Sequence, residues 1–427
     1  MHPIISGKQL KNFCIYGLGA TGKSVVKFLK RKKVSKFCTF DDESKKKNNA
    51  KIFSENLDTA DYIVVSPGIN IKKSRFKKKL KKYQNKIITD LDLFYSLNPK
   101  IKSIVITGTN GKSTTCKILE HVFKKNNINA ELGGNIGKPI LNLNLKKKKL
   151  VIIEVSSFQL AYSKFIKPDF AIILNINSDH LDWHGTLKNY TESKFRIFSN
   201  QKENNFAFLN DKKLVKKFKK NKYLSKLRFV KLNKFKFLKK KINNKYLNSN
   251  TNFENLAFVY SLSKFFKIKN KAFYRSLESF EGLAHRYEVF HENKNKIFIN
   301  DSKATSFEAC KQALYNNKNI YWIVGGMPKK GDKFNIKSLK KNINKAYIIG
   351  NYSKFFKKKL NKKINYQVCH SLNKAIISIF KDLKKENNRK TIILLSPAAA
   401  SYDQFKNFEE RGNKFKKLIK KYSKKYL

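Results

Sequence analysis

The chain of 427 residues lacks the features that mark membrane and secreted proteins. No apolar run approaches the ~18 residues that a membrane-spanning helix needs, so no membrane span is expected. The first residues show neither a long apolar stretch nor a small-residue cleavage site, which argues against a signal peptide. The five cysteines never form a C-x-x-C pair. This scattering disfavours a structural zinc site and predicts a location in the reducing cytoplasm.

Acidic residues and arginine are both scarce. The sequence has 30 acidic residues against 94 lysines and arginines, a formal net charge of +64, and only eight of the basic residues are arginine. A basic chain can bind nucleic acid or an anionic membrane surface, but nucleic-acid readers favour arginine. Abundant lysine, asparagine, isoleucine and phenylalanine together are typical of an AT-rich genome. We therefore expect solvated lysine faces and no specific nucleic-acid partner. A basic nucleic-acid-binding NTPase is the rival hypothesis.

The composition and length predict a globular protein of several domains. Hydrophobic residues make up 41% of the chain, which excludes a disordered protein. Strand-like and helix-like segments alternate along it, which predicts the α/β class. Changes in motif and composition divide the chain into three expected domains, at 1–98, 99–282 and 283–427.

The first segment carries the pattern of a nucleotide-binding strand, turn and helix. A short apolar strand at 13–16 leads into Gly17, Gly19 and Gly22, which have G-x-G-x-x-G spacing. The helix that should follow is expected to bury Val25, Val26, Phe28 and Leu29. Asp41 comes 19 residues after Gly22, at the end of the expected strand KFCTF. The pattern predicts a bound nucleotide but does not choose between NAD and another one, and a tight turn without a ligand is the alternative.

The stretch IVITGTNGKSTTC (104–116) predicts a second nucleotide loop between a strand and a helix. It lacks the longer G-x-x-x-x-G-K-[ST] motif and has G-x-x-G-K-S instead. Gly108 and Gly111 would let backbone N–H groups approach phosphate oxygens. Lys112 would reach the transferred phosphate, and Ser113 or Thr114 would place a hydroxyl on Mg²⁺.

The remaining pattern predicts further elements. We expect strands at 150–160 and 170–176, helices at 189–198 and 249–266, and small strands with one solvated face in the lysine-rich region 212–247. In the third segment, strands are expected at KIFIN, NIYWIVGG, KAYIIG and TIILLSP. We see no repeat at a fixed short period.

The loop TGTNGKST resembles the shortened ATP loop of the Mur ligases, ATP-dependent amide ligases of three domains that are related to folylpolyglutamate synthases. Other segments resemble the same family in the same order over nearly the whole chain: GGNIGKP, EVSSFQL, NSDHLD, ESKFRIF, GLAHR, NDSKAT and SPAAASYDQFKNFEERGNKF. Within the family, DSKAT and SPAAASYDQFKNF are similar to the branch that adds D-glutamate. The resemblance implies a Rossmann-like first domain for a uridine nucleotide, a central ATPase domain of the P-loop type, and a Rossmann-like C-terminal domain for the amino acid.

The resemblance also implies the reaction. The carboxylate of UDP-N-acetylmuramoyl-L-alanine would attack the γ-phosphate of ATP, and the amine of D-glutamate would attack the resulting acyl phosphate, as a step of cytoplasmic peptidoglycan precursor synthesis. Catalytic roles would fall to Lys112, Glu154, His180, Lys194 and Lys303. ATP would contact Gly108, Thr109, Asn110, Gly111, Lys112, Ser113, Thr114, Asn252, Asn255, Arg286 and Asp301. Two Mg²⁺ ions would be held by Ser113, Thr114, Glu154, His180 and Lys194, the last as a carbamate formed with CO₂.

The residues themselves leave alternatives at several of these positions. Glu154 lies in an apolar strand, where a buried acid without a cation would be costly. Asn252 and Asn255 lie three apart, so one helix face can present both amides. An unmodified Lys194 paired with phosphate is the alternative to a carbamate, and Asp301 could be an ordinary turn cap.

The resemblance also implies which residues contact the two substrates, the uridine nucleotide and D-glutamate. The uridine nucleotide, and not NAD, would contact Gly19, Thr21, Gly22, Asp41, Ser66, Pro67, Gly68, Asn135 and His180. D-Glutamate would contact Thr305, Lys329, Ser401 and Phe408. Some members have arginine where Glu43 stands, so the uridine-side contacts stay open. Lys330 is the alternative to Lys329 as the lysine that holds D-glutamate.

A monomer is expected. The runner-up activities are a sibling ligase for another amino acid and a folate polyglutamylating enzyme.

Overall fold

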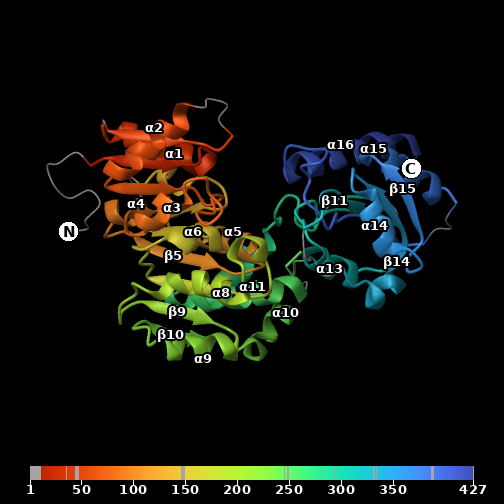
Figure 1. The fold of residues 1–427 in the computed structure, drawn as a ribbon. Helices are drawn as coiled ribbons and strands as arrows, with labels where there is room; N and C mark the ends of the chain where they lie inside the picture. The colour runs from red at the N-terminus through yellow and green to blue at the C-terminus, as the bar shows by residue number, and fades with distance from the viewer. Residues whose placement is uncertain are drawn as a thin grey trace. The chain divides into compact units, whose positions relative to one another are not determined.

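The computed structural model describes residues 11–34, 36–43, 48–145, 150–244, 246–247, 250–293, 295–329, 332, 334–385 and 389–426. The chain forms two compact units, Met1–Phe280 and Glu281–Leu427, and each is considered by itself. Figure 1 shows the first unit in red to green and the second in teal to blue.

The first unit begins with a small parallel sheet. Its strands have the order β2-β1-β3-β4, so the first strand lies between the next two along the chain. The strands are β1 (Phe13–Tyr16), β2 (Phe37–Phe40), β3 (Tyr62–Val65) and β4 (Ile87–Ile88). The helices are α1 (Ala20–Arg31), α2 (Asn48–Thr59), α3 (Lys77–Lys82) and α4 (Asp90–Leu97). In α1, Val25, Phe28 and Leu29 are buried as predicted, but Val26 is only half-buried.

A second parallel sheet of six strands follows, in the order β10-β9-β8-β5-β7-β6. The strands are β5 (Lys102–Thr107), β6 (Ala130–Gly134), β7 (Leu150–Glu154), β8 (Phe170–Ile173), β9 (Phe206–Leu209) and β10 (Lys226–Phe229). The helices are α5 (Lys112–Lys125), α6 (Ser157–Tyr162), α7 (Leu181–His184), α8 (Leu187–Phe195), α9 (Lys212–Lys220), α10 (Phe237–Lys241), α11 (Asn250–Phe265) and α12 (Asn270–Glu278). The central strand β5 lies between β8 and β7, which is the switch point where ligands usually bind in such sheets.

Two predictions for this sheet are wrong. The expected strand at 150–160 stops at Glu154, because Ser156 and Gln159 form a reciprocal capping box that starts α6. The lysine-rich region 212–247 is mostly helical and contributes one strand, β10, among the described residues. Asp211 caps α9, and Leu214 and Phe218 lie four residues apart on its buried face. The apolar residues therefore follow the spacing of a helix here, and not the every-second-residue alternation of a strand.

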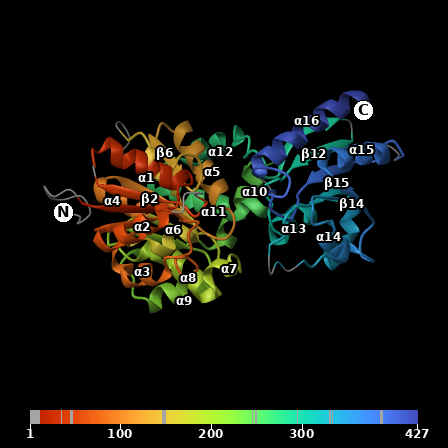
Figure 2. The same ribbon diagram turned by 45° about the horizontal axis from the view of Figure 1, so that its top comes forward.

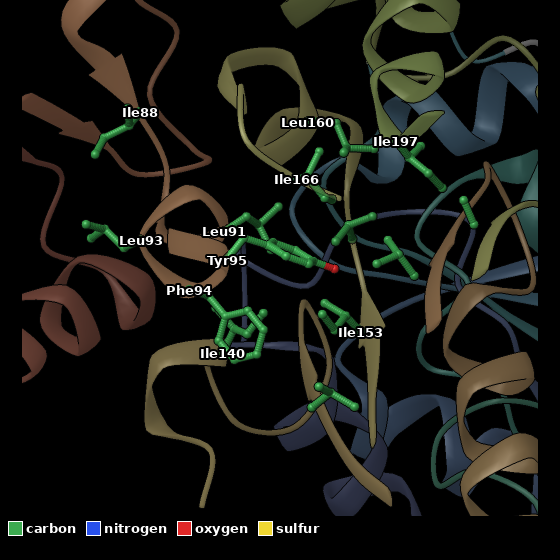
Figure 3. Packing of buried hydrophobic residues seen from close by; sticks show 14 of the residues in the cluster. Ile88, Leu91, Leu93, Phe94, Tyr95, Ile140, Ile153, Leu160, Ile166 and Ile197 are labelled. Atoms are coloured by element: carbon green, nitrogen blue, oxygen red, sulfur yellow. The ribbon is translucent and has the colours of Figure 1, made fainter. Parts of the chain in front are cut away.

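One hydrophobic core joins the two sheets of this unit through α4. Leu91, Leu93, Phe94 and Tyr95 of that helix lie in the same buried cluster as Ile88 of the first sheet and as residues of the second. Figure 3 shows these side chains between Ile88 and Ile153. The first sheet is therefore firmly attached to the second, although they hold different predicted ligands.

A buried carboxyl at the start of α4 gives a test of this junction. Asp90 is fully buried, and burial, with Asp92 nearby, raises its pKa from 3.8 to about 6. A raised pKa favours the protonated form in the folded state, so the stabilisation is complete below pH 3.8 and is lost as the pH rises through about 6. Asp90→Asn should remove this loss, which is on the order of 3 kcal/mol. Unfolding in urea across this pH range measures it.

The control for this prediction is Asn85→Ala at the exposed Asn85, which removes no titratable group and should leave the pH dependence of unfolding unchanged. An Asp90→Asn protein that loses stability with rising pH as steeply as the wild type would contradict the assignment.

The second unit is one six-stranded sheet with helices on both faces. Its order is β11-β12-β16-β13-β14-β15, parallel except for β11. The strands are β11 (Glu288–Asn293), β12 (Lys296–Asn300), β13 (Ile320–Gly325), β14 (Ile343–Ile349), β15 (Tyr366–His370) and β16 (Thr391–Leu395). Buried residues of α13 (Phe307–Tyr315) and α14 (Ser353–Leu360) cover one face, and those of α15 (Leu372–Leu383) and α16 (Phe408–Tyr426) cover the other (Figure 2).

The predicted fold class is confirmed: the chain is α/β and contains three sheets. All four strands expected in the third segment are present, whereas β11 and β15 were not predicted. The domain boundaries at 98/99 and 282/283 stay predictions. In the part of the chain that the structure describes, no helix combines the length and the hydropathy needed to cross a membrane.

Candidate active site

The predicted ATP loop follows the central strand of the second sheet. Gly111 has the left-handed φ of +84°, and a Cβ there would lie 2.3 Å from Oδ1 of Asn255, so only glycine fits. Asn255 accepts a hydrogen bond from Thr115 Oγ1 at 3.1 Å and donates one to Asn252 at 3.3 Å. The predicted pair of amides on α11 therefore lies against the loop and the first turns of α5.

Gly111→Ala should consequently destabilise the protein and weaken ATP binding. The left-handed backbone alone costs about 1–2 kcal/mol for a residue with a side chain, and the clash with Asn255 adds to this. Gly68→Ala is the stability control, because a Cβ at Gly68 meets no atom within 4 Å. Thermal melting and ATP titration test the pair, and an unchanged melting temperature for Gly111→Ala would contradict the steric account.

Residues after β8 hold the loop from its other side. Asn175 accepts Thr109 N through its backbone oxygen and Asn110 N through its side chain, both at 2.9 Å. Ser113 and Thr114 lie buried in the first turn of α5. The loop thus places the positive N-terminal end of α5, with Ser113 and Thr114 in its first turn, at the end of the central strand, which suits a bound phosphate.

Two lysine ammonium groups meet at this loop. Nζ of Lys112, at the start of α5, and Nζ of Lys194, on α8, each donate to the backbone oxygen of Gly108 at 2.8 Å. Lys194 is buried, and its Nζ also lies 4.6 Å from the centre of the Tyr190 ring. Burial first, and the charge of Lys112 second, hold the pKa of Lys194 well below 10.5. The buried site therefore disfavours the protonated form of Lys194.

Glu154 ends β7 next to these lysines. Its carboxylate is buried; Oε1 accepts a hydrogen bond from Asn135 Nδ2 at 2.8 Å, whereas Oε2 has no hydrogen-bond partner among the described residues. A buried carboxylate oxygen without a donor suits a hard cation such as Mg²⁺. The described residues contain no cluster of three or more His, Cys, Asp and Glu, so further ligands would have to come from hydroxyls, phosphate or a modified lysine.

His180 lies beside the same loop, at the start of α7. It has the left-handed φ of 54°, its backbone N–H donates to Asp179, and its ring packs at 4.6 Å against Phe158 of α6. The charges of both Asp179 and Glu154 act on Lys194 and favour its protonation. Lys112, Glu154, His180 and Lys194 are thus brought to one end of the sheet from four separate segments.

Seven of the nine predicted uridine-nucleotide residues lie at the carboxyl ends of the first sheet, whereas Asn135 and His180 lie at the second sheet. A Cβ on Gly22 would lie 1.8 Å from the backbone oxygen of Gly17, so α1 can approach β1 only because Gly22 has no side chain. Ser66 Oγ donates to the same oxygen at 2.7 Å. Asp41 accepts the backbone N–H groups of Leu18 and Glu43, so its carboxylate stabilises the loop. Gly19, Pro67 and Gly68 complete these two loops, and Thr21 lies in the first turn of α1.

Beside this loop lies a groove of about 380 Å³. It is lined by Leu18, Lys23, Val26, Lys27, Lys30 and Thr39. Three of these residues are lysines of α1, but the surface that lines the groove is mostly apolar, so the groove by itself does not select an anionic ligand.

Comparisons with known proteins decide the family. Residues 11–88 match the Mur ligase MurD-like N-terminal domain, and residues 106–273 match the Mur ligase middle domain. The UDP-N-acetylmuramoylalanine–D-glutamate ligase of Rickettsia prowazekii is 33% identical over 437 residues, with 96% of this chain and 97% of that protein covered. The protein of the same name from Aquifex aeolicus is 33% identical over 419 residues, with 95% and 98% covered. The chain belongs to the Mur ligase family.

Solved Mur ligases have the same fold. The MurF ligase of Thermotoga maritima, determined in complex with ADP, has a TM-score of 0.58 at 18% identity and covers 88% of this chain and 94% of its own. The UDP-N-acetylmuramate-alanine ligase MurC of the same organism has a TM-score of 0.56 at 14% identity, with 97% and 100% covered.

In the C-terminal unit of this Mur ligase, the loop after β12 carries Asp301 and Lys303. Both oxygens of Asp301 accept hydrogen bonds, from Tyr287 N at 3.1 Å and from Ser396 Oγ at 2.7 Å, and burial raises its pKa to about 7. Asp301 therefore links the backbone at Tyr287, just before β11, to Ser396, just after β16. The Lys303 ammonium lies 3.9 Å from the centre of the Phe408 ring, so the structure brings these two predicted residues together.

The other predicted amino-acid residues of the Mur ligase lie at the same end of this sheet. Met327 and Ala400 exchange two backbone hydrogen bonds of 2.9 Å, which places the loops that carry Lys329 and Ser401 side by side. Ser401 is buried, and Thr305 is half-buried just before α13. Lys330, the alternative to Lys329, lies outside the described residues.

Two residues of the candidate site were not predicted from the sequence. Tyr190 OH lies 3.0 Å from Thr109 Oγ1, and Asp179 contributes the negative charge nearest to His180. Tyr190 precedes Lys194 by four residues on a helix, so the spacing was a usable signal. For Asp179 the only signal was its place before His180.

Proposed function

We propose that this chain joins D-glutamate to UDP-N-acetylmuramoyl-L-alanine with hydrolysis of ATP to ADP and phosphate, as a step in peptidoglycan synthesis. Relatives that carry this name are about one-third identical over almost the full chain, which is the observation that carries the proposal. The nucleotide loop, the buried carboxylate and the paired lysines support it, because they suit phosphoryl transfer to a carboxylate.

The reaction needs two anions to meet. The substrate carboxylate attacks the γ-phosphorus of ATP, the bond to the β-phosphate oxygen breaks, and an acyl phosphate and ADP form. The D-glutamate amine then attacks the acyl carbon, loses a proton and expels phosphate from the tetrahedral intermediate. Positioning and charge neutralisation supply most of the catalysis in such steps.

In this mechanism the loop residues Gly108 to Thr114 bind the phosphates of ATP. Lys112 leaves the Gly108 carbonyl to contact the γ-phosphate and neutralises charge as the acyl phosphate forms. Mg²⁺, once bound, would screen the phosphate oxygens, and Ser113, Thr114 and Glu154 would hold it. Asn252 and Asn255 would contact the adenine end of ATP, and Arg286 and Asp301 stay predicted ATP contacts.

Lys194 carries the second part of the proposal. A neutral buried amine can react with CO₂ and become a carbamate, which turns a cation into an anion. That anion, with His180 beside it, would hold a second Mg²⁺. The low pKa of Lys194 supports this modification, because only the unprotonated amine reacts.

The two substrates occupy opposite ends of the proposed reaction path. Gly19, Thr21, Gly22 and Asp41, with Ser66 to Gly68, Asn135 and His180, hold the sugar nucleotide. D-Glutamate is held by Thr305, Lys329, Ser401 and Phe408, while Lys303 lies next to the Phe408 ring and approaches the acyl phosphate. We place the enzyme in the cytoplasm as a monomer.

Phosphate release across an amino-acid panel tests this function. With ATP, Mg²⁺ and UDP-N-acetylmuramoyl-L-alanine, D-glutamate should give rapid release, and L-glutamate, L-alanine and diaminopimelate should give little. A different best amino acid would indicate a sibling ligase, and a requirement for a folate would indicate the polyglutamylating activity. Release that depends on DNA or RNA, with a steep salt dependence, would support the rival NTPase.

A further inference from the structure

Two cysteines that lie 24 residues apart in the sequence meet in the first sheet. Cys14 of β1 and Cys38 of β2 are direct partners in the parallel register. Their Sγ atoms are 2.8 Å apart and form a hydrogen bond, and both thiols are free. Nothing in the proposed ligase reaction uses them.

The backbone at this pair suits a disulfide. Neighbouring strands lie about 4.7–4.9 Å apart, and this spacing falls inside the ~4.4–6.8 Å that separates the Cα atoms of most disulfides. A bonded pair has its sulfurs about 2.05 Å apart, so closing the present 2.8 Å contact requires the two sulfurs to approach by less than about 1 Å. Little backbone movement is needed.

The two thiols also differ in a way that suits stepwise oxidation. Cys14 is buried with Tyr16, Phe40 and Phe53 in the cluster under α2, whereas Cys38 is only half-buried. The hydrogen bond from Cys14 lowers the pKa of the Cys38 thiol. The more accessible sulfur is therefore the one that more readily becomes a thiolate, which is the reactive form.

The remaining cysteines have no such arrangement. Cys116, Cys310 and Cys369 are buried, and burial raises the pKa of each thiol. These three provide internal controls within the same chain.

We propose that Cys14 and Cys38 are a redox modification site that a hydroperoxide converts into an intramolecular disulfide. The Cys38 thiolate attacks the peroxide, the O–O bond breaks, and Cys38 becomes a sulfenic acid while an alcohol or water leaves. The Cys14 thiol then attacks that sulfur and expels water, which carries away the hydroxyl and the thiol proton. Two electrons pass from the sulfurs to the peroxide. A dithiol reductant reverses the reaction by exchange.

Peptide mapping tests the proposal on the intact, folded chain. The protein is treated with hydrogen peroxide, its remaining thiols are alkylated, and it is digested with trypsin. Cleavage after lysine places Cys14 in peptide 12–23 and Cys38 in peptide 37–45. We expect these two peptides to appear joined, and the titratable thiols to fall by two from the initial five. Dithiothreitol should restore both.

Matched variants fix the assignment. Cys38→Ser should abolish the joined peptide, and Cys369→Ser should leave its yield unchanged. The proposal is overturned if peptides 12–23 and 37–45 stay separate in the wild type while Cys38 accumulates as sulfinic acid. It is equally overturned if they join only after the protein is unfolded in urea. None of these outcomes depends on ligase activity, so they remain informative if the proposed function fails.

Discussion

Lys112→Ala should lower kcat for phosphate release by about 10²–10³-fold, the usual cost of losing one group that stabilises charge in the transition state. Lys112 is the first residue of α5, and its ammonium already lies at the ATP loop, on the carbonyls of Gly108 and Thr109. Its charge is needed most while the γ-phosphate moves to the substrate carboxylate. Steady-state kinetics with D-glutamate, together with circular dichroism, measure the effect.

Lys117→Ala is the matched control for Lys112. Lys117 lies in the same helix, but its ammonium pairs at 2.8 Å with Glu120 and not with the loop. This variant should retain near-normal kcat. If Lys112→Ala also retained it, with native circular dichroism, the ATP-loop assignment would be lost.

Lys194→Ala should reduce activity about 10–100-fold or more, the range seen when a group that supports a metal site is removed. Because the proposed active form is a carbamate, the wild-type enzyme should also slow when CO₂ and bicarbonate are removed. A short carboxylate such as acetate should restore part of the Lys194→Ala activity, and should not help Lys112→Ala. Lys194→Arg should fail, because a guanidinium cannot become an anion.

The exposed Lys188 on the same helix provides the control for Lys194. Lys188→Ala should keep its activity and its response to CO₂. A fully active Lys194→Ala enzyme, or wild-type activity that is indifferent to CO₂, would rule the carbamate out. Mass spectrometry is unsuited as the sole readout, because a carbamate is lost in acid.

Elements set by short local signals could be predicted from the sequence. The strand, glycines and helix around Gly22 and around Gly111 were predicted in type and order, because each needs glycine at a fixed close approach. The stretch 150–160 could not be read correctly, since an apolar strand runs straight into a helix whose start depends on Ser156 and Gln159 bonding to each other. The helix at 212–220 was not predicted, because its buried face consists of only Leu214 and Phe218 among many lysines.

Candidate site residues could be named from the sequence, but their geometry could not. Lys112 and Lys194 are 82 positions apart, and no pattern in the sequence says that they bond to one carbonyl. The contact of Cys14 with Cys38 likewise depends on the register of β1 against β2. A search for closely spaced cysteines such as C-x-x-C cannot find a pair of this kind. The support of the ATP loop by Asn175 and Asn255 arises from β8 and α11, and only the assembled sheet brings these two together.

The shared carbonyl of Gly108 sets an order of events. While both lysines bond to it, burial first and the charge of Lys112 second lower the pKa of Lys194, which favours the amine that the proposed carbamate needs. In the proposed mechanism, bound ATP would draw Lys112 onto its phosphates and bring negative charge nearby, which would favour protonation of an unmodified Lys194. On that proposal, Lys194 reacts with CO₂ more readily in the enzyme without nucleotide than in the enzyme that holds ATP. Carbamate formation on Lys194 is therefore expected between turnovers, when the site holds no nucleotide. An enzyme that is saturated with ATP before CO₂ is added should show a lag before it reaches its full rate.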